Sequence, residues 1–345
     1  MSAPTENRGS DARATPPPAL AARHVRYDDL VPCRNAFVDT RTPGSDAKEN
    51  FTIVGPGVSE NPNQHVHVPE PHGYNIGAAR QPPGCLNSQH SHLTAEVFVV
   101  HSGEWAFRYG VDADDGEVRL SPGDTISIPQ MMFRGFENVG EETGFLFAVL
   151  GGDDPGKVTW APRVFELARD YGLVLLEGGR LVDTAAGETV PEGATRQRVP
   201  DAEELLALAT AAPDRLEGCV ARADALPAHG GTAGGGDWAS VGVEVRPVIV
   251  DADANGGGVR HWWPHGFDLH RLRVDPGAST ARREIGTPTV VFAHAGALVV
   301  EVGDDAVGLG AGDTFSVPVG VQCAIRNPAD GPAEAFVVTG RPGAA

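Results

Sequence analysis

Positive charge is scarce in this sequence. Its 345 residues carry 27 Lys and Arg against 46 Asp and Glu, which gives a formal net charge of −19. Nucleic-acid binders need clustered positive charge to meet the phosphate backbone, so we expect no nucleic-acid partner. A locally positive site could still bind a small anionic substrate, despite the negative net charge of the whole protein.

Paired cysteines and long apolar runs are also missing. None of the four cysteines forms a CxxC pair, so neither a zinc knuckle nor a disulfide framework is indicated. No apolar run approaches the roughly 18 residues that a membrane span requires. The N-terminus lacks the basic-then-apolar order of a signal peptide. We therefore expect a soluble, cytoplasmic protein with no membrane partner.

Glycine and proline, in contrast, are abundant. The chain has 44 Gly and 28 Pro, and this punctuation favours many short strands joined by turns over long helices. Strand-like sequence fills residues 51–150 and 238–340, and the hydrophobic content of 41% is adequate for a buried core. Helices are expected over 160–177 and 201–209. The expected fold class is all-β with minor helices.

The two strand-rich halves repeat each other. HGYNIGAARQPPG begins at His72 and HGFDLHRLRVDPG at His265, each running 12 residues from His to the last Gly. GDTISIP (123–129) then matches GDTFSVP (312–318) at five of seven positions, and the glycine spacings between these motifs agree as well. Matched features in the same order predict two copies of one β-domain.

Three metal-ligand residue types lie close together in the first copy. His90, His92 and Glu96 are separated by two and four residues. Even spacings return to one face of a β-strand, so an extended segment would point all three side chains the same way, unless a turn at 93–94 disturbs it. Two imidazoles and one carboxylate form the facial arrangement of non-haem iron(II) enzymes, with positions left for substrate, water or dioxygen.

The segment also resembles the first motif of the cupin family, G-x5-H-x-H-x3-E-x6-G, from Gly84 to Gly103. The second cupin motif, G-x5-P-x-G-x2-H-x3-N, is met only in part. Met131 replaces its Gly, and Arg134 replaces the His that would be a fourth ligand. The resemblance covers about 200 residues and implies a bicupin, two jelly-roll-like cupin barrels in tandem.

The resemblance suggests four segments and an asymmetry between the barrels. In the second copy the residues at the ligand positions do not form a metal-binding set, so no metal is expected there. We expect this barrel to have a structural or interface role instead. The residues at its ligand positions are Arg283, Ile285, Thr289 and Cys323. The segments are a disordered lead-in (1–20), a metal-binding N-terminal barrel (21–150), a helical connection with a Gly-rich linker at 230–236 (151–237), and a degenerate C-terminal barrel (238–345).

Arg134 is the most informative departure from the motif, and three readings are open. A guanidinium cannot ligate a metal in its usual form but binds carboxylates and phenolate-type oxygens in a bidentate manner. Arg134 is therefore a candidate catalytic residue that anchors an anionic substrate beside the metal. Alternatively, it pairs with Glu96 in a site that holds no metal, or it points outward and does neither.

Four residues are candidates for substrate binding. By analogy with cupins, Trp105 and Phe107 face the barrel interior and would stack on an aromatic substrate, although ordinary core packing also accounts for them. Asn87 lies three residues before His90 and either bonds substrate or dioxygen, or forms a turn. Gln81 shares the parity of the small residues Gly77 and Ala79 and is a polar pocket candidate.

Two other histidines are expected to lie outside the metal site. His72 has a counterpart, His265, in the copy without a metal site, and this favours a structural role for both. His101 has odd parity relative to Glu96 and should face away from it.

The function implied by the resemblance is a non-haem iron(II) oxygenase or dioxygenase, a metal-dependent oxidoreductase with an architecture like that of gentisate dioxygenases. It would act with dioxygen on a small oxygen-bearing aromatic or heteroaromatic compound, in catabolism or specialised-metabolite biosynthesis. Fe(II) is the expected metal, although Mn, Ni, Cu or Zn also suit this ligand set. A redox-neutral decarboxylase, isomerase or lyase, and a non-catalytic ligand-binding cupin, are the alternatives. A homodimer is expected.

Overall fold

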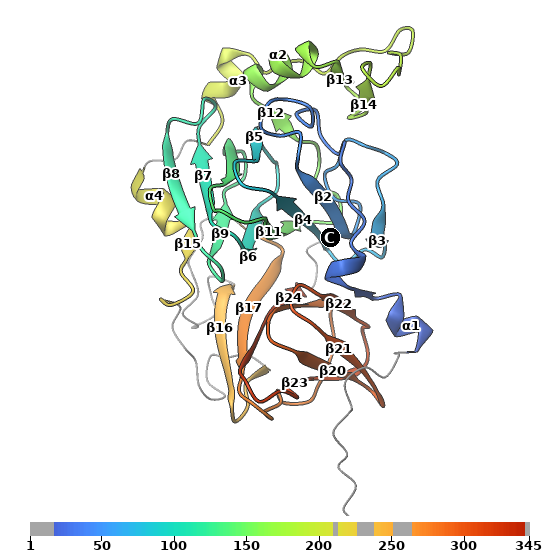
Figure 1. Cartoon of the computed structure of the whole chain (residues 1–345), viewed down its shortest axis with the longest axis vertical. Coiled ribbons are helices and arrows are strands. Elements are labelled where there is room, and N and C mark those ends of the chain that lie inside the picture. Colours follow the sequence, from blue (N-terminus) through green and yellow to red (C-terminus); the bar gives the residue numbers. More distant parts are fainter. Residues whose placement is uncertain (1–16, 210–212, 226–237, 251–263, 342–345) are drawn as a thin grey trace, which may run out of the picture.

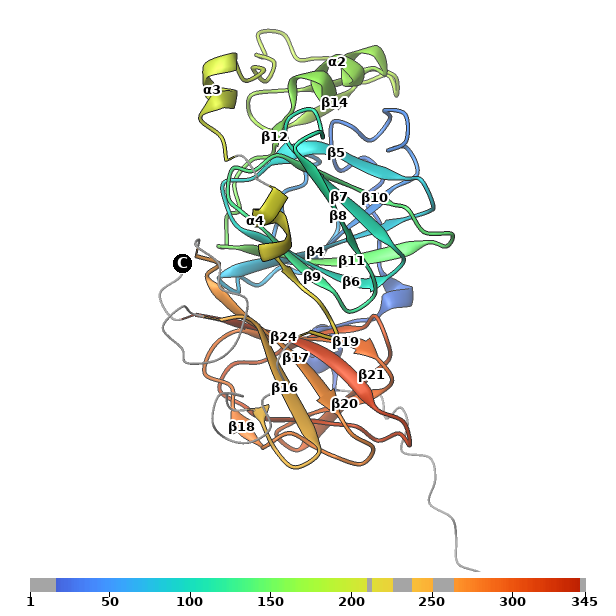
Figure 2. The ribbon, with the colours of Figure 1, turned by 90° about the vertical axis from the view of Figure 1, so that its left-hand side faces the viewer.

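Two β-barrels stacked along the long axis of the molecule account for most of the computed structural model (Figures 1 and 2). The structure describes residues 17–209, 213–225, 238–250 and 264–341. Residues 1–16 of the predicted disordered lead-in (1–20) and the Gly-rich linker lie outside the described residues. The end of that lead-in is ordered, because Pro18 begins α1 (Pro18–Ala21) and Leu20 is buried. The structure confirms the repeat predicted from the sequence, because it shows two barrels of the same architecture in tandem.

The first barrel consists of a seven-stranded and a five-stranded sheet. The strand order in the larger sheet is β15-β9-β6-β11-β4-β2-β3, and in the smaller β12-β5-β10-β7-β8. The bounds are β2 (Glu49–Val54), β3 (Val66–Val68), β4 (Tyr74–Gln81), β5 (Leu86–Ser91), β6 (Glu96–Ser102), β7 (Trp105–Tyr109), β8 (Gly116–Leu120), β9 (Thr125–Ile128), β10 (Arg134–Asn138), β11 (Gly144–Gly151), β12 (Thr159–Trp160) and β15 (Val220–Ala221).

The second barrel repeats this plan with a six-stranded and a four-stranded sheet. Their orders, β1-β22-β19-β24-β17-β16 and β18-β23-β20-β21, match the first barrel strand for strand over most of their length. The bounds are β1 (His24–Val25), β16 (Val243–Ile249), β17 (Phe267–Val274), β18 (Arg283–Glu284), β19 (Thr289–Ala295), β20 (Leu298–Val302), β21 (Asp305–Leu309), β22 (Thr314–Val317), β23 (Gln322–Arg326) and β24 (Ala333–Gly340).

Short elements join and cover the barrels. They are α1 (Pro18–Ala21), η1 (Tyr27–Asp29), α2 (Pro162–Asp170), β13 (Leu173–Leu175), β14 (Leu181–Asp183), α3 (Ala202–Leu206) and α4 (Pro213–Gly218). Strand β1 pairs with β22, so it belongs to the sheet of the second barrel although the predicted N-terminal unit began at residue 21. No described helix is long and apolar enough to cross a membrane.

The helix expected over 160–177 is shorter than predicted. It ends at Asp170, two residues before Gly172, whose φ of +77° cannot continue a right-handed helix. The following apolar residues form β13, which pairs with β14 in a two-stranded sheet. The expected helix at 201–209 forms over α3, and Asp201 and Glu204 make a reciprocal capping box at its start.

The two barrels meet through an apolar core and a reciprocal pair of polar contacts. The rings of Phe147 and Phe292, one from each barrel, are stacked with centroids 4.3 Å apart. His72 Nε2 lies 2.7 Å from Ser316 Oγ, and Ser127 Oγ lies 2.6 Å from His265 Nε2. Because the motifs containing these residues are repeats of each other, the contacts are related by the duplication. The structural interpretation of His72 and His265 is confirmed.

Replacing both His72 and His265 with alanine is expected to destabilise the joint between the barrels. Each replacement removes one buried inter-barrel hydrogen bond, so we expect a loss of about 2 kcal/mol in the free energy of unfolding for the pair. Urea denaturation measures this loss. Metal binding should be unchanged, because neither residue contacts the metal-ligand cluster; an unaltered unfolding curve would contradict the assignment.

Candidate metal centre

The three predicted ligands come from two strands and the turn between them. His90 lies near the end of β5, His92 follows in the turn, and Glu96 begins β6. The chain is therefore not extended from 90 to 96, and the alternation that predicted one shared face does not apply. The turn carries the chain from β5 in the five-stranded sheet to β6 in the seven-stranded sheet, and the three side chains meet at this crossing.

The ligand atoms of His90, His92 and Glu96 lie within 4.8 Å of one another, and all three residues are buried. His90 Nδ1 donates to the carbonyl oxygen of Ser88 at 2.7 Å, which leaves its Nε2 as the ligand atom. Burial, followed by the positive charge of Arg134, lowers the pKa of His90 and of His92 well below the usual value. Both imidazoles are therefore neutral and can donate a lone pair.

Arg134 points into this cluster. It begins β10 directly opposite His90 on β5, and its side chain is fully buried. Its guanidinium donates to the carbonyl oxygen of His90 at 3.0 Å and forms an ion pair with Glu96. Burial raises the pKa of Glu96, and the charge of Arg134 opposes that rise. The reading in which Arg134 faces outward is wrong, and the pairing with Glu96 is the contact that the second reading expected.

The backbone around Arg134 carries two local adaptations. Met131, which stands where the motif has Gly, keeps the left-handed conformation with a φ of +63°, a conformation that non-glycine residues adopt at some cost. Its amide donates to the carbonyl oxygen of His92 at 2.7 Å. Gly135 allows β10 to approach β5, because an added Cβ would lie 2.7 Å from the Asn87 carbonyl oxygen. This approach places Arg134 over the histidine pair.

The donor set fits a divalent first-row metal. Two neutral imidazoles and a carboxylate suit iron or manganese, among others. His92 Nδ1 is buried without a hydrogen-bond partner in the described part of the chain. Glu96 uses Oε2 for Arg134, and no described group bonds its Oε1. The oxygen paired with Arg134, Oε2, also lies 3.8 Å from His92 Nε2, so a metal would share the Glu96 carboxylate with Arg134 and take both imidazoles.

A cavity of about 70 Å³ opens beside the three ligands. Asn87 lines it, as predicted for a residue that approaches the metal, and Phe98 and Phe136 contribute apolar walls. A cavity that binds benzene has a volume of about 150 Å³. The space as it stands therefore suits a molecule smaller than an aromatic ring.

Trp105, Phe107 and Gln81 do not line this cavity. Trp105 and Phe107 are fully buried in the barrel core, where both rings pack against Phe136. Gln81 is also fully buried, and its amide finds no hydrogen-bond partner among the described residues. Analogy with cupins placed the two rings inside the barrel, and parity placed Gln81 there. The rings of Trp105 and Phe107 lie behind Phe136, which itself lines the cavity.

The second barrel does not assemble a comparable cluster in its described part. Arg283 and Cys323 are paired across β18 and β23, as His90 and Arg134 are in the first barrel. Ile285 and Cys323 are buried in the apolar core of this barrel. The Thr289 hydroxyl donates to the carbonyl oxygen of Thr287 at 3.0 Å. Among the described residues, the candidate metal ligands belong to the first barrel alone.

His101 faces the joint between the barrels. Its ring centroid lies 5.3 Å from that of Phe292 and 5.5 Å from that of His294 in the second barrel. The prediction that it turns away from Glu96 is confirmed.

Supporting residues of the centre went unnoticed in the sequence. Glu60 accepts hydrogen bonds from Trp160 Nε1 at 2.6 Å and from the Val38 amide at 2.7 Å. The Trp160 ring in turn lies 5.1 Å from the ring of His90. No motif or spacing identified Glu60, because its contacts join segments about 20 and 100 residues away.

Glu60 is expected to make the stability of the protein fall as pH rises. Burial raises the pKa of Glu60 to about 8 from 4.5. The folded state therefore retains a proton that the unfolded state releases between these values, and this contribution is full below pH 4.5 and lost as pH rises towards 8. Its size is on the order of 5 kcal/mol, because one pKa unit corresponds to about 1.4 kcal/mol.

Urea denaturation measures the contribution of Glu60 to the free energy of unfolding. The wild type and Glu60→Gln are compared at about pH 5 and about pH 9, which span most of the range between the two pKa values of Glu60. The variant should be less stable at the lower pH, since its amide oxygen can replace only one of the two carboxyl oxygens that accept hydrogen bonds, but its stability should depend less on pH. Equal pH slopes in the two proteins would be inconsistent with a protonated Glu60.

Comparisons with known proteins agree with the repeated architecture. A family model described as a cupin domain matches twice, at residues 78–150 and 270–339. No curated protein matches the sequence.

The solved structures that resemble this chain share its fold at low identity. The oxalate decarboxylase of Lactobacillus farciminis, in complex with formate, is 12% identical with a TM-score of 0.54, over 98% of this chain and 88% of that one. A Bacillus subtilis oxalate decarboxylase described with Mn(II) centres is 12% identical with a TM-score of 0.53, over 98% and 79%. AerE from Microcystis aeruginosa is 11% identical with a TM-score of 0.49, over 90% and 97%.

Proposed function

We propose, since this chain is a bicupin of the cupin superfamily, that its N-terminal barrel is a metal-dependent enzyme site for a small carboxylate-bearing compound. His90, His92 and Glu96 would hold the metal. Bound there, a divalent cation would supply Lewis-acid polarisation of the substrate. Mn(II) and Fe(II) both suit the donor set.

The buried guanidinium of Arg134 carries this proposal. It takes the place of a fourth neutral ligand, so one more position stays open beside the imidazoles. Because Arg134 already balances the charge of Glu96, the charge of a divalent cation would remain uncompensated in a buried site. An anionic substrate supplies the missing negative charge, and a carboxylate also matches the geometry of a guanidinium.

The walls of the cavity favour binding and orientation of such an anion. Asn87 offers a polar side chain, and the rings of Phe98 and Phe136 exclude water. Exclusion of water strengthens each charge interaction inside the cavity. Arg134 is not among the residues that line the cavity, but its positive charge, held at Glu96, would stabilise negative charge that develops on the bound carboxylate during reaction.

The size of the cavity favours small substrates over the aromatic compounds expected from the sequence. A redox-neutral reaction on a small carboxylate, such as a decarboxylation, is our leading proposal. Oxalate decarboxylases among the structures of similar fold give this reaction class a precedent on the same architecture. An iron(II) oxygenase is the second candidate, because two histidines and one carboxylate form the ligand set of that class.

Turnover assays on metal-loaded protein separate these candidates. Protein reconstituted anaerobically with Mn(II) or Fe(II) is offered a panel of small carboxylates, and carbon dioxide release and oxygen uptake are followed together. We expect release of product without stoichiometric oxygen uptake, and no release by His92→Ala. Oxygen uptake in proportion to product would establish the oxygenase instead, and ligand binding without turnover would show a non-catalytic cupin.

A further inference from the structure

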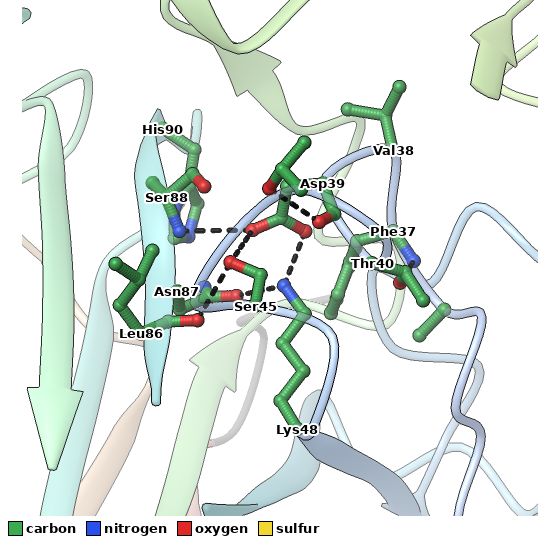
Figure 3. A network of polar contacts seen from close by, with 12 residues as sticks. Phe37, Val38, Asp39, Thr40, Ser45, Lys48, Leu86, Asn87, Ser88 and His90 are labelled. Atoms are coloured by element: carbon green, nitrogen blue, oxygen red, sulfur yellow. Dashed lines mark hydrogen bonds and ion pairs between the residues drawn. The ribbon is translucent and has the colours of Figure 1, made fainter. Parts of the chain in front are cut away.

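A buried ion pair lies behind the wall of the cavity. The chain has two lysines, Lys48 and Lys157, and the side chain of Lys48 is completely buried. Lys48 is paired with Asp39, whose side chain is also completely buried (Figure 3). Both residues precede the family motifs and neither lines the cavity, so the metal centre by itself does not account for them.

The ion pair fixes the orientation of the Asn87 side chain. Lys48 Nζ donates to Asn87 Oδ1 at 2.7 Å. An ammonium group has donors only, so the amide atom that faces it must be the oxygen. The Asn87 Nδ2 group is therefore turned away from Lys48, and it has no hydrogen-bond partner in the described part of the chain. Since Asn87 lines the cavity, this leaves an N–H donor for a ligand there.

The same carboxylate also holds the strand that carries His90. Asp39 Oδ2 accepts from the Ser88 amide at 3.0 Å, and the Ser88 carbonyl oxygen accepts from His90 Nδ1 at 2.7 Å. Figure 3 shows Asp39 between Lys48 and this stretch of β5. The buried Asp39 carboxylate is thus linked through Ser88 to the metal ligand His90. Through Lys48 it is also linked to Asn87.

A second amide donor lines the cavity without a protein partner. Asn50 Nδ2, on β2, is buried and has no hydrogen-bond partner among the described residues. Buried donors are normally satisfied, so the unused Asn50 N–H group, together with the Asn87 N–H group on the same cavity wall, indicates a ligand rich in acceptor oxygens.

We propose that the Lys48–Asp39 pair is a positioning pair that fixes Asn87 as a hydrogen-bond donor in the substrate cavity. It would select compounds that carry a second oxygen-bearing group besides the carboxylate held at the metal, such as small dicarboxylates. This inference rests on the proposed function. A buried ion pair is often no more stabilising than apolar residues of similar volume, so stability alone is a weak reason for its presence.

Two variants separate positioning from structural support. Asn87→Asp keeps an oxygen for Lys48 but replaces the donor with an acceptor. The double variant Asp39→Asn/Lys48→Met removes both charges together, so no unpaired buried charge remains. The amide oxygen that replaces the Asp39 carboxylate can still accept from the Ser88 amide.

The matched control for these variants is Lys157→Met. It removes the other lysine, which is exposed and bonds the carbonyl oxygen of Glu177.

The probes are malonate and propionate, which differ in one carboxylate group. Their affinities for Mn(II)-loaded protein are measured by calorimetry, together with the affinity for Mn(II) alone. We expect both variants to bind malonate at least about tenfold more weakly, because a hydrogen bond to a charged group is lost. Propionate and Mn(II) affinities should stay at the wild-type level, and Lys157→Met should behave as wild type.

Wild-type affinity for malonate in the Asp39→Asn/Lys48→Met variant would overturn the inference, as would equal affinities of the wild type for malonate and propionate. A general loss of Mn(II) binding in both variants would also overturn it, by showing that the pair supports the fold of the centre. Failure of the wild type to bind Mn(II) or Fe(II) would be a different result, because it removes the proposed function itself.

Discussion

Replacing Arg134 with leucine is expected to abolish binding of small carboxylates and to destabilise the metal-free protein. The substitution leaves Glu96 as an unpaired charge in a buried site, and breaking such a pair by removing one partner costs about 3–5 kcal/mol. Loss of the guanidinium also removes the positive charge that would attract the substrate carboxylate to the centre. Carboxylate affinity measured on Mn(II)-loaded protein should fall by at least about 100-fold, since bonds between charged groups are the strong ones.

Arg134→His tests the same assignment from the opposite direction. It restores the fourth ligand of the family motif, so we expect tighter metal binding together with loss of carboxylate binding. Arg283→Leu is the matched control, because Arg283 stands at the position of the second barrel that corresponds to His90. It should change neither property. Carboxylate binding that survives in Arg134→Leu would show that Arg134 serves only to neutralise Glu96.

Replacing His92 with alanine is expected to remove the metal. Loss of an outer partner of a metal ligand typically costs about 10–100-fold in affinity, so loss of a ligand itself should cost at least about 100-fold. Calorimetric titration with Mn(II) under anaerobic conditions measures the change. Turnover should fall below detection in the same variant.

His67→Ala provides the control for this loss. His65 and His67 repeat the HxH spacing, and their rings lie 4.4 Å apart, but in the described residues they are not part of the cluster with a carboxylate. The control should bind Mn(II) as the wild type does. Equal losses in His67→Ala and His92→Ala would place the metal elsewhere or attribute both effects to misfolding.

Much of the architecture could be predicted because it repeats. The histidine-to-glycine spacing at His72 and His265 is the same in both halves, and the two strand orders correspond. The structure brings His90, His92 and Glu96 together as expected, but not for the geometric reason given. Alternation along one strand was expected, whereas a turn after His92 places Glu96 on the next strand. A spacing motif fixes which residues meet without revealing the path of the chain between them.

Other features of the site depend on contacts that no local pattern encodes. Analogy with cupins places Trp105 and Phe107 in the barrel interior, but it cannot tell the cavity from the core behind it. Lys48 and Asp39 are charged residues in a loop-rich segment, where the default expectation is exposure. Their burial follows from the packing of that segment against β5, which is a contact between distant parts of the chain. The spacing of nine residues between Asp39 and Lys48 gives no sign of that contact.

The central claim is that His90, His92 and Glu96 together hold one divalent cation in the first barrel. Elemental analysis of the untagged protein after anaerobic reconstitution and removal of free metal tests this claim most directly. The account predicts about one equivalent of Mn(II) or Fe(II) per chain, as expected for a single three-ligand site, in the wild type and in Arg134→Leu, and almost none in His92→Ala. Protein that stays metal-free under these conditions, or His92→Ala that retains a full equivalent, would contradict it.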